Sequence, residues 1–498
     1  MPQSAEVPVE PYRRAWSALL AAQVLAMAAV GLYCTGSQRY LYADGSHFFI
    51  TLLQSRHVMD FDPARQFAHL LMEYPAVFLV RHLNCRDVGL VGFTYGATLF
   101  LAPVAGLFLT WWAARKAPAH YWFYPMLSQS IMFLNVSFEP LDIHVATWLF
   151  WCLMYLLLFP ARLSFGLSAL LIGLAVFATC AYETYLFLAW PLVACAWIRG
   201  RRAYTERRYC ELATCGVCLL LFLISFAVAL RSTLVPRDAA NRDNFAVSML
   251  LHLVYPPVWY SLMAIACACW SAQGPDGRRG WRVVRAVTFG CGFLVALLPF
   301  AGFVVPPLQH ISRVQGLYVP LILGGFVLVR FCFLQTTPGI SKTRHDELWR
   351  LTAWTCVVAV IFQCGATYQW NRYRNLLLGE LAQHRGIVAY EDFAMASPIY
   401  EELVQNVDYR SAWLSEVAEA PGQSLRRLAL SQFNFGFGWA LPSLSVALSA
   451  LNLGTVTTII EAPDAVWWQP FDPRDPSAIP DLSDFGVSTI LESRENSP

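Results

Sequence analysis

The sequence is poor in charged residues, and in lysine above all. Only 14% of its 498 residues are charged, whereas soluble domains carry about a quarter, and lysine occurs only as Lys116 and Lys342. The 35 Lys+Arg and 33 Asp+Glu residues nearly balance, so no basic field indicates a nucleic-acid partner. With 57% hydrophobic residues and 18 tryptophans, the composition excludes an ordinary soluble enzyme and predicts a polytopic membrane protein.

Cysteine is not scarce, but it is absent after Cys364, and no pair of CxxC elements has metal-binding spacing. Most of the 14 cysteines lie within apolar runs. This distribution indicates small apolar side chains packed in helices rather than a disulfide framework.

Long apolar runs dominate the first 370 residues and predict eleven transmembrane helices. Each run is near the ~20 residues that span a bilayer, and helices satisfy their own backbone hydrogen bonds in lipid. Arg13 and Arg14 precede the first run, which we expect to be a retained helix rather than a cleaved signal peptide. The runs are 15–34, 88–112, 120–138, 142–159, 164–181, 184–198, 212–230, 249–270, 286–305, 317–334 and 351–369.

The distribution of Lys and Arg predicts a cytoplasmic N-terminus. Both lysines, the run Arg199–Arg208 and most other arginines then fall in inner connections. An odd number of helices places the C-terminal part outside. We therefore predict a membrane domain over 1–370 with an outer loop at 35–87, and an extracytoplasmic domain over 371–498. The absence of cysteine from that outer domain favours a bacterial inner membrane, with the domain in the periplasm.

The C-terminal part has ordinary polarity and predicts a small α/β domain. Segments 386–390 and 455–461 have the pattern of strands, and segments 397–406 and 423–431 that of helices.

Four carboxylates fall at the predicted outer face. Asp44 lies soon after the first helix, Glu139 and Asp142 lie between helices three and four, and Glu183 lies between helices five and six. Acids at a membrane boundary are costly and are therefore candidates for function. Each also has a structural interpretation, because Asp44-Gly45-Ser46 has the composition of a helix start or turn.

This arrangement of a long first outer loop, an acid soon after helix one and a second acidic site between helices three and four resembles the GT-C superfamily. These are multi-pass glycosyltransferases that use polyprenyl-phosphate-linked sugars. The resemblance implies that Asp44 is the catalytic base or orients the acceptor, with Glu139 and Asp142 beside it. It also implies amphipathic helices in the loop, for which 46–57 and 63–82 are suited. Many members carry paired acids in this loop, whereas here Asp44 is single and the pair Asp60–Phe61–Asp62 comes later.

By this resemblance the partners are a polyprenyl-phosphate-sugar donor, an acceptor glycan, lipid or protein, and the membrane lipids. A departing phosphate needs cationic partners, and the outer side lacks lysine, so arginine or histidine is expected to serve. The predicted substrate-binding residues are Glu183, His310, Arg313, Arg56 and His144, and further cationic candidates are Arg39, Arg81, Arg231, Arg372 and Arg374. No metal ligands are assigned, because the histidines lack zinc spacing; a divalent metal is left open as a cofactor.

Two other functional classes remain compatible with the sequence. A transporter or flippase would use buried acids to couple ions, and Pro256-Pro257 and Pro306-Pro307 are compatible with broken helices. A noncatalytic assembly or sensor protein would use the outer domain to bind a partner.

Overall fold

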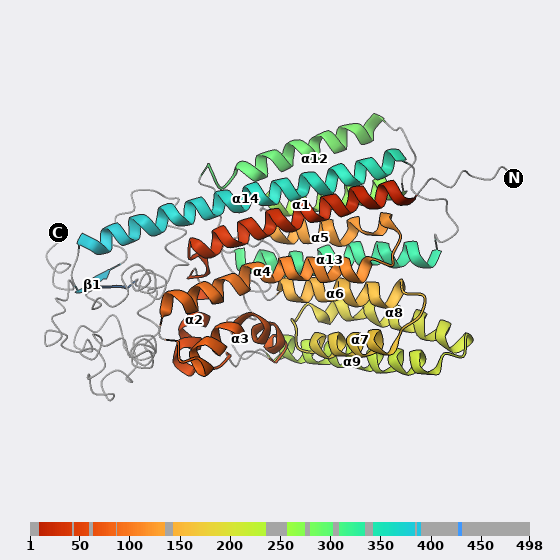
Figure 1. Cartoon of the computed structure of the whole chain (residues 1–498). Helices are drawn as coiled ribbons and strands as arrows, with labels where there is room; N and C mark the ends of the chain where they lie inside the picture. Colours follow the sequence, from red (N-terminus) through yellow and green to blue (C-terminus); the bar gives the residue numbers. More distant parts are fainter. Residues whose placement is uncertain are drawn as a thin grey trace.

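The protein is an almost entirely helical molecule in a computed structural model (Figure 1). The structure describes residues 9–41, 44–58, 63–85, 87–134, 143–235, 256–273, 279–301, 308–333, 342–383, 386–389 and 427–430. The long helices are α1 (Val9–Gly36), α4 (Val88–Ala114), α5 (Phe123–Leu134), α6 (Ile143–Leu158), α7 (Phe165–Ala178), α8 (Tyr185–Thr205), α9 (Tyr209–Leu234), α11 (Pro256–Gln273), α12 (Arg279–Leu297), α13 (Leu308–Phe333) and α14 (Lys342–Gln383).

These helices pack side by side and run in alternating directions, which gives the bundle two ends (Figure 1). At the N-terminal end, where α1 and α14 begin, the Trp16 indole N–H donates to Nε2 of His345 at 2.5 Å. At the opposite end, the loop end, the Trp370 indole N–H donates to the carbonyl oxygen of Ser37 at 2.8 Å. The first and last long helices are therefore joined at both ends of the bundle.

Five of the helices are long and apolar enough to cross a membrane, over Tyr12–Gly36, Gly89–Ala114, Tyr209–Leu234, Gln315–Cys332 and Lys342–Leu376. The chain is an integral membrane protein. Each of the eleven apolar runs in the sequence overlaps one of the long helices. Within the predicted run 120–138, the structure describes α5 over Phe123–Leu134; residues 135–138 lie outside the described residues.

The core of the bundle is formed by α5 and α6, in which every residue is buried. Helices buried on all sides need no polar face, and this accounts for the almost entirely apolar sequence of α6. Glycines allow close packing against these helices: a methyl group at Gly316 would overlap Ile143, and one at Gly324 would lie 2.7 Å from the Phe150 ring. The core thus depends on small residues facing large ones.

The last long helix, α14, continues past residue 370, where the sequence predicts the boundary between the membrane and outer parts. It has 42 residues, so its length is about 63 Å, twice the ~30 Å of hydrocarbon that a span must cross. The boundary expected at 370 falls inside this continuous helix, which extends beyond the other helices at the loop end (Figure 1).

Two short strands follow α14, β1 (Gly386–Ala389) and β2 (Arg427–Leu430), and they pair in parallel with Gly386 opposite Arg427. The first lies within the segment 386–390 that was expected to be a strand. The second corrects an expectation, because 423–431 was predicted to be a helix. The segment Arg427–Leu430 is too short for its apolar pattern to distinguish a helix from a strand, and pairing with β1 decides for the strand. Segments 397–406 and 455–461 lie outside the described residues.

The first connection at the loop end contains two helices, α2 (Asp44–Ser55) and α3 (Gln66–His82), preceded by the 3-10 turn η1 (Arg39–Leu41). They coincide with the segments 46–57 and 63–82 expected to be helical. One face of α3 packs inward through Ala68, Met72, Ala76, Val77 and Val80. The other face exposes Leu70, Leu71, Tyr74 and Phe78, so α3 has apolar residues on both sides. Such a helix suits a position at the membrane surface.

Candidate functional site at the loop end

The start of α2 is fixed to the bundle at the position of Asp44. The Tyr95 hydroxyl on α4 donates to the carbonyl oxygen of Gly45 at 3.2 Å, which ties the first turn of α2 to a buried residue. Asp44 is the first residue of the helix. Its position is therefore set by a neighbouring helix and not by the loop alone.

An aromatic cluster packs beside the first turn of α2. The rings of Tyr40, Phe49 and Tyr95 contact one another pairwise, with centroids 5.3 to 5.9 Å apart. Gly92 and Gly96 on α4 make room for Tyr40, because a methyl group on either one would meet the Tyr40 side chain. The cluster holds η1, α2 and α4 in one arrangement.

Two buried arginines flank the cluster. Arg39, with no exposed surface, donates from Nη1 to Oγ1 of Thr367 at 2.8 Å and lies 3.4 Å from Sγ of Cys34. Arg374, near the end of α14, is also buried. Burial raises the pKa of Tyr40, and the positive charge of Arg374 partly opposes that rise. One guanidinium group therefore belongs to the turn that leads to Asp44, and the charge of a second acts on Tyr40 in the same turn.

A histidine–carboxylate pair is buried in α3. Nδ1 of His69 lies 2.6 Å from Oε1 of Glu73, both side chains are almost wholly covered, and the Phe48 ring of α2 packs edge-on against the imidazole at 4.9 Å. Sequence analysis missed Glu73. The signal was available, because a spacing of four residues places both side chains on the same face of a helix.

Glu183 contacts the first connection directly. Nε of Arg65 lies 2.6 Å from its Oε1, and the same guanidinium lies 4.9 Å from the Tyr182 ring. The backbone N–H of Phe67 donates to the carbonyl oxygen of Cys180 at 2.9 Å beside this pair. The second oxygen, Oε2, is covered and has no hydrogen-bond partner among the residues that the structure describes. Glu183 thus anchors α3 through one oxygen, and its other oxygen is buried.

His144 lies in the first turn of α6 and is 2% exposed. Neither ring nitrogen has a hydrogen-bond partner within the described part of the chain. A buried imidazole without partners is costly, and it needs a donor or acceptor from another group. The contact between His144 and a substrate stays a prediction.

The remaining predicted residues are only partly placed. Glu139 and Asp142 lie outside the described residues, in the segment just before His144, and so do Asp60 and Asp62. His310 and Arg313 lie in the first two turns of α13, which begin at the loop end. Arg56 follows α2 with a positive φ of 54° and is exposed. The structure therefore brings Asp44, Glu183 and His144 to the loop end, together with the cationic candidates Arg39 and Arg374. It adds Arg65 and Glu73 to the candidate site.

No metal cluster is found in the part of the chain described: no three His, Cys, Asp or Glu side chains converge there. Comparison with protein families, curated proteins and solved structures gives no significant match to this chain. The site is therefore defined by its own chemistry. It combines buried guanidinium groups, which suit an anionic ligand, with carboxylates and an imidazole, which suit hydroxyl groups.

Proposed function

We propose that the protein is a membrane glycosyltransferase of the GT-C type, which transfers a sugar from a polyprenyl-phosphate donor to an acceptor glycan, lipid or protein. One observation carries the proposal: the first connection folds into α2 and α3 at the loop end, and it starts α2 at Asp44, only five residues after the buried Arg39. A carboxylate near fixed cationic groups suits the transfer of a sugar away from phosphate.

The proposed topology is that of the sequence analysis. All eleven long helices cross the membrane, the N-terminal end faces the cytoplasm, and the loop end faces outward with the α/β domain that follows α14. The basic residues of the N-terminal end support this orientation, since Arg115, Lys116 and Arg201 are exposed there. In a bacterium the loop end would lie at the periplasmic face of the inner membrane.

In the proposed reaction the acceptor hydroxyl attacks the anomeric carbon of the sugar. The bond from acceptor oxygen to carbon forms while the bond from carbon to phosphate oxygen breaks, and the electron pair leaves with the polyprenyl phosphate. Asp44 takes the proton of the hydroxyl, together with Glu139 and Asp142 as orienting groups. Arg39 and Arg374 stabilise the charge that develops on the phosphate. Glu183 and His144 contact sugar or acceptor hydroxyls, and His310, Arg313 and Arg56 complete the substrate-binding set.

The test is sugar transfer by purified protein in nanodiscs. Removal of a general base costs about 10²–10⁴-fold in rate, so Asp44→Asn is expected to fold normally and lose nearly all turnover. Asp60→Asn and Asp62→Asn serve as matched controls from the same loop and are expected to have much smaller effects. Undiminished transfer by a monodisperse Asp44→Asn protein would remove this residue from the mechanism and move the role to Asp60 and Asp62.

A further inference from the structure

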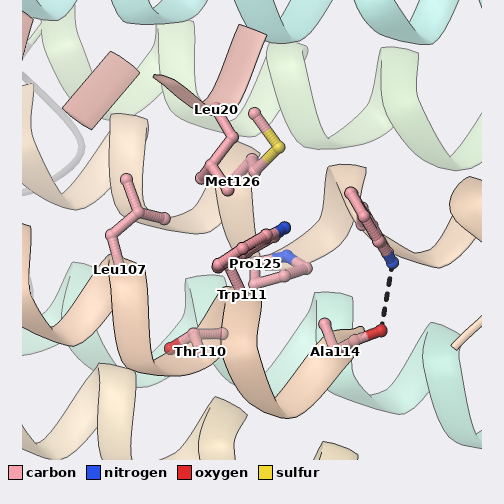
Figure 2. A pocket seen from close by; sticks show the side chains of 8 residues that line it. Leu20, Leu107, Thr110, Trp111, Ala114, Pro125 and Met126 are labelled. Atoms are coloured by element: carbon pink, nitrogen blue, oxygen red, sulfur yellow. Dashed lines mark hydrogen bonds between the residues drawn. The ribbon is translucent and has the colours of Figure 1, made fainter. Parts of the chain in front are cut away.

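At the N-terminal end, far from the candidate site, an apolar crevice opens between α1, α4 and α5 (Figure 2). It is lined by Leu20, Leu107, Thr110, Trp111, Ala114, Trp122, Pro125 and Met126. The Trp122 indole N–H donates to the carbonyl oxygen of Ala114 at 3.1 Å, a hydrogen bond drawn as a dashed line in Figure 2.

The lining of the crevice is apolar apart from one hydroxyl and the indole N–H groups of two tryptophans. The Thr110 hydroxyl, its only hydroxyl, donates within the bundle to the carbonyl oxygen of Gly106 at 2.8 Å. The Trp111 indole N–H is covered and has no acceptor among the residues described. A lining that is mostly apolar favours contact with apolar groups such as methylenes.

Basic residues surround the crevice at the end of the bundle. The Arg13 guanidinium lies 5.5 Å from the Trp122 ring centroid and donates to the carbonyl oxygen of Arg115. The Arg115 guanidinium lies 4.7 Å from the ring of Trp112. Arg14 and Lys116 are also exposed here. Since the apolar span of α1 begins at Tyr12, these cations lie at the depth of lipid headgroups.

We propose that this place binds one anionic glycerophospholipid, with its phosphate on Arg13 and Arg115 and the first part of an acyl chain against the crevice. Such a lipid matches the site in three respects. Its phosphate is negatively charged and its methylenes are apolar. Its ester oxygen can accept a hydrogen bond from the Trp111 N–H, which has no acceptor among the described residues. Basic pockets between membrane helices are suited to acidic headgroups. The aromatic rings that hold both guanidinium groups in place distinguish this site from general attraction to a negative surface.

A matched control lies on the same end of the bundle. Arg201, in the last turns of α8, is exposed and makes no hydrogen bond or ring contact with the part of the chain that the structure describes. It lies at the same end of the bundle as Arg13, and the lining of the crevice does not include any residue of α8. A general electrostatic effect would act on Arg201 and Arg13 alike.

The experiment is native mass spectrometry of protein released from nanodiscs of phosphatidylglycerol and phosphatidylcholine. Wild-type protein is expected to retain one phosphatidylglycerol, and Arg13→Gln or Arg115→Gln to reduce its occupancy about fivefold, as expected for one lost cation at the surface. Arg201→Gln should behave as wild type. Thermal unfolding of the same samples gives a second measurement: phosphatidylglycerol should raise the midpoint of wild type and of Arg201→Gln, but not that of Arg13→Gln.

Three results would overturn the proposal. Equal loss of lipid in Arg201→Gln would show general surface attraction, and equal retention of phosphatidylcholine by wild type would show that charge plays no part. Displacement of the lipid by millimolar glycerol phosphate would show that the headgroup alone binds. If Arg13→Gln does not fold, Arg115→Gln, which leaves the Arg115 backbone carbonyl in place, carries the test.

Discussion

The guanidinium of Arg65 lies 2.6 Å from the carboxylate of Glu183 and joins the first connection to the turn between α7 and α8. The two residues are 118 positions apart in the sequence. Together with the hydrogen bond from Phe67 to Cys180, the pair fixes the start of α3 over the loop end. The orientation of the first connection, and with it the candidate site, depends on this contact.

Removal of either partner is expected to loosen α3. Hydrogen bonds to charged groups contribute about 1.5–3 kcal/mol, and we expect Glu183→Gln and Arg65→Gln each to lower the free energy of unfolding by about that amount. Because both changes break the same contact, the double variant should cost much less than the two together. Thermal unfolding in detergent measures the cycle, and strictly additive effects would show that the two residues do not interact.

The fit of Tyr40 against α4 gives a second prediction. A methyl group at Gly96 would overlap the Tyr40 ring, and overpacking of this kind costs about 1–3 kcal/mol. Gly96→Ala should therefore destabilise the protein and, by displacing η1 and Arg39, reduce sugar transfer as well. Gly173→Ala is the control, since a methyl group there meets nothing within 4 Å and alanine favours the helix. Equal stability of the two variants would contradict the packing argument.

The N-terminal end provides a comparison of a buried and an exposed ion pair. Nη2 of Arg199 lies 2.7 Å from Oε1 of Glu211, and both side chains are buried. Loss of one partner from such a pair leaves a buried charge and costs about 3–5 kcal/mol, so Glu211→Gln should be strongly destabilising. The control Glu206→Gln breaks an exposed pair with Arg202 and should have little effect on the unfolding midpoint.

The exposed carboxylate of Glu206 gives a prediction on the response of stability to acid. The hydrogen bond from Arg202 holds the pKa of Glu206 below its usual value, with Arg208 adding to the effect. A carboxylate with a lowered pKa favours the folded state above its unfolded pKa, and this contribution disappears as the pH falls through the folded pKa. The Glu206→Gln variant should therefore lose less stability than wild type on acidification to pH 3. A parallel loss in both proteins would show that Glu206 contributes nothing.

The helices could be predicted from the sequence because an apolar run of bilayer length must satisfy its backbone hydrogen bonds within lipid, as a helix does. The contacts that the side chains of the candidate site make could not be predicted. Arg65 meets Glu183, and Arg39 meets Thr367, only because distant helices pack at the same end. The extent of α14 was also missed, since polar residues after 370 end the apolar run without ending the helix. Hydropathy marks where a helix leaves the membrane and not where it stops.

The length of α14 leads to the last prediction. The 21 residues from 351 to 371 carry no charge and are flanked by Arg350 and Arg372, so the uncharged part is about 32 Å long and matches the hydrocarbon thickness. The proposed orientation places Lys342 in the cytoplasm and Asn375 outside. A fluorescent protein, which matures in the cytoplasm, should therefore report when fused after Lys342 and stay dark after Asn375. Alkaline phosphatase, which is active only outside, should give the opposite pattern at the two positions. Signals on the same side at both positions would refute the crossing by α14. An inverted pattern would keep the crossing but place the loop end, and the proposed glycosyltransferase site with it, in the cytoplasm.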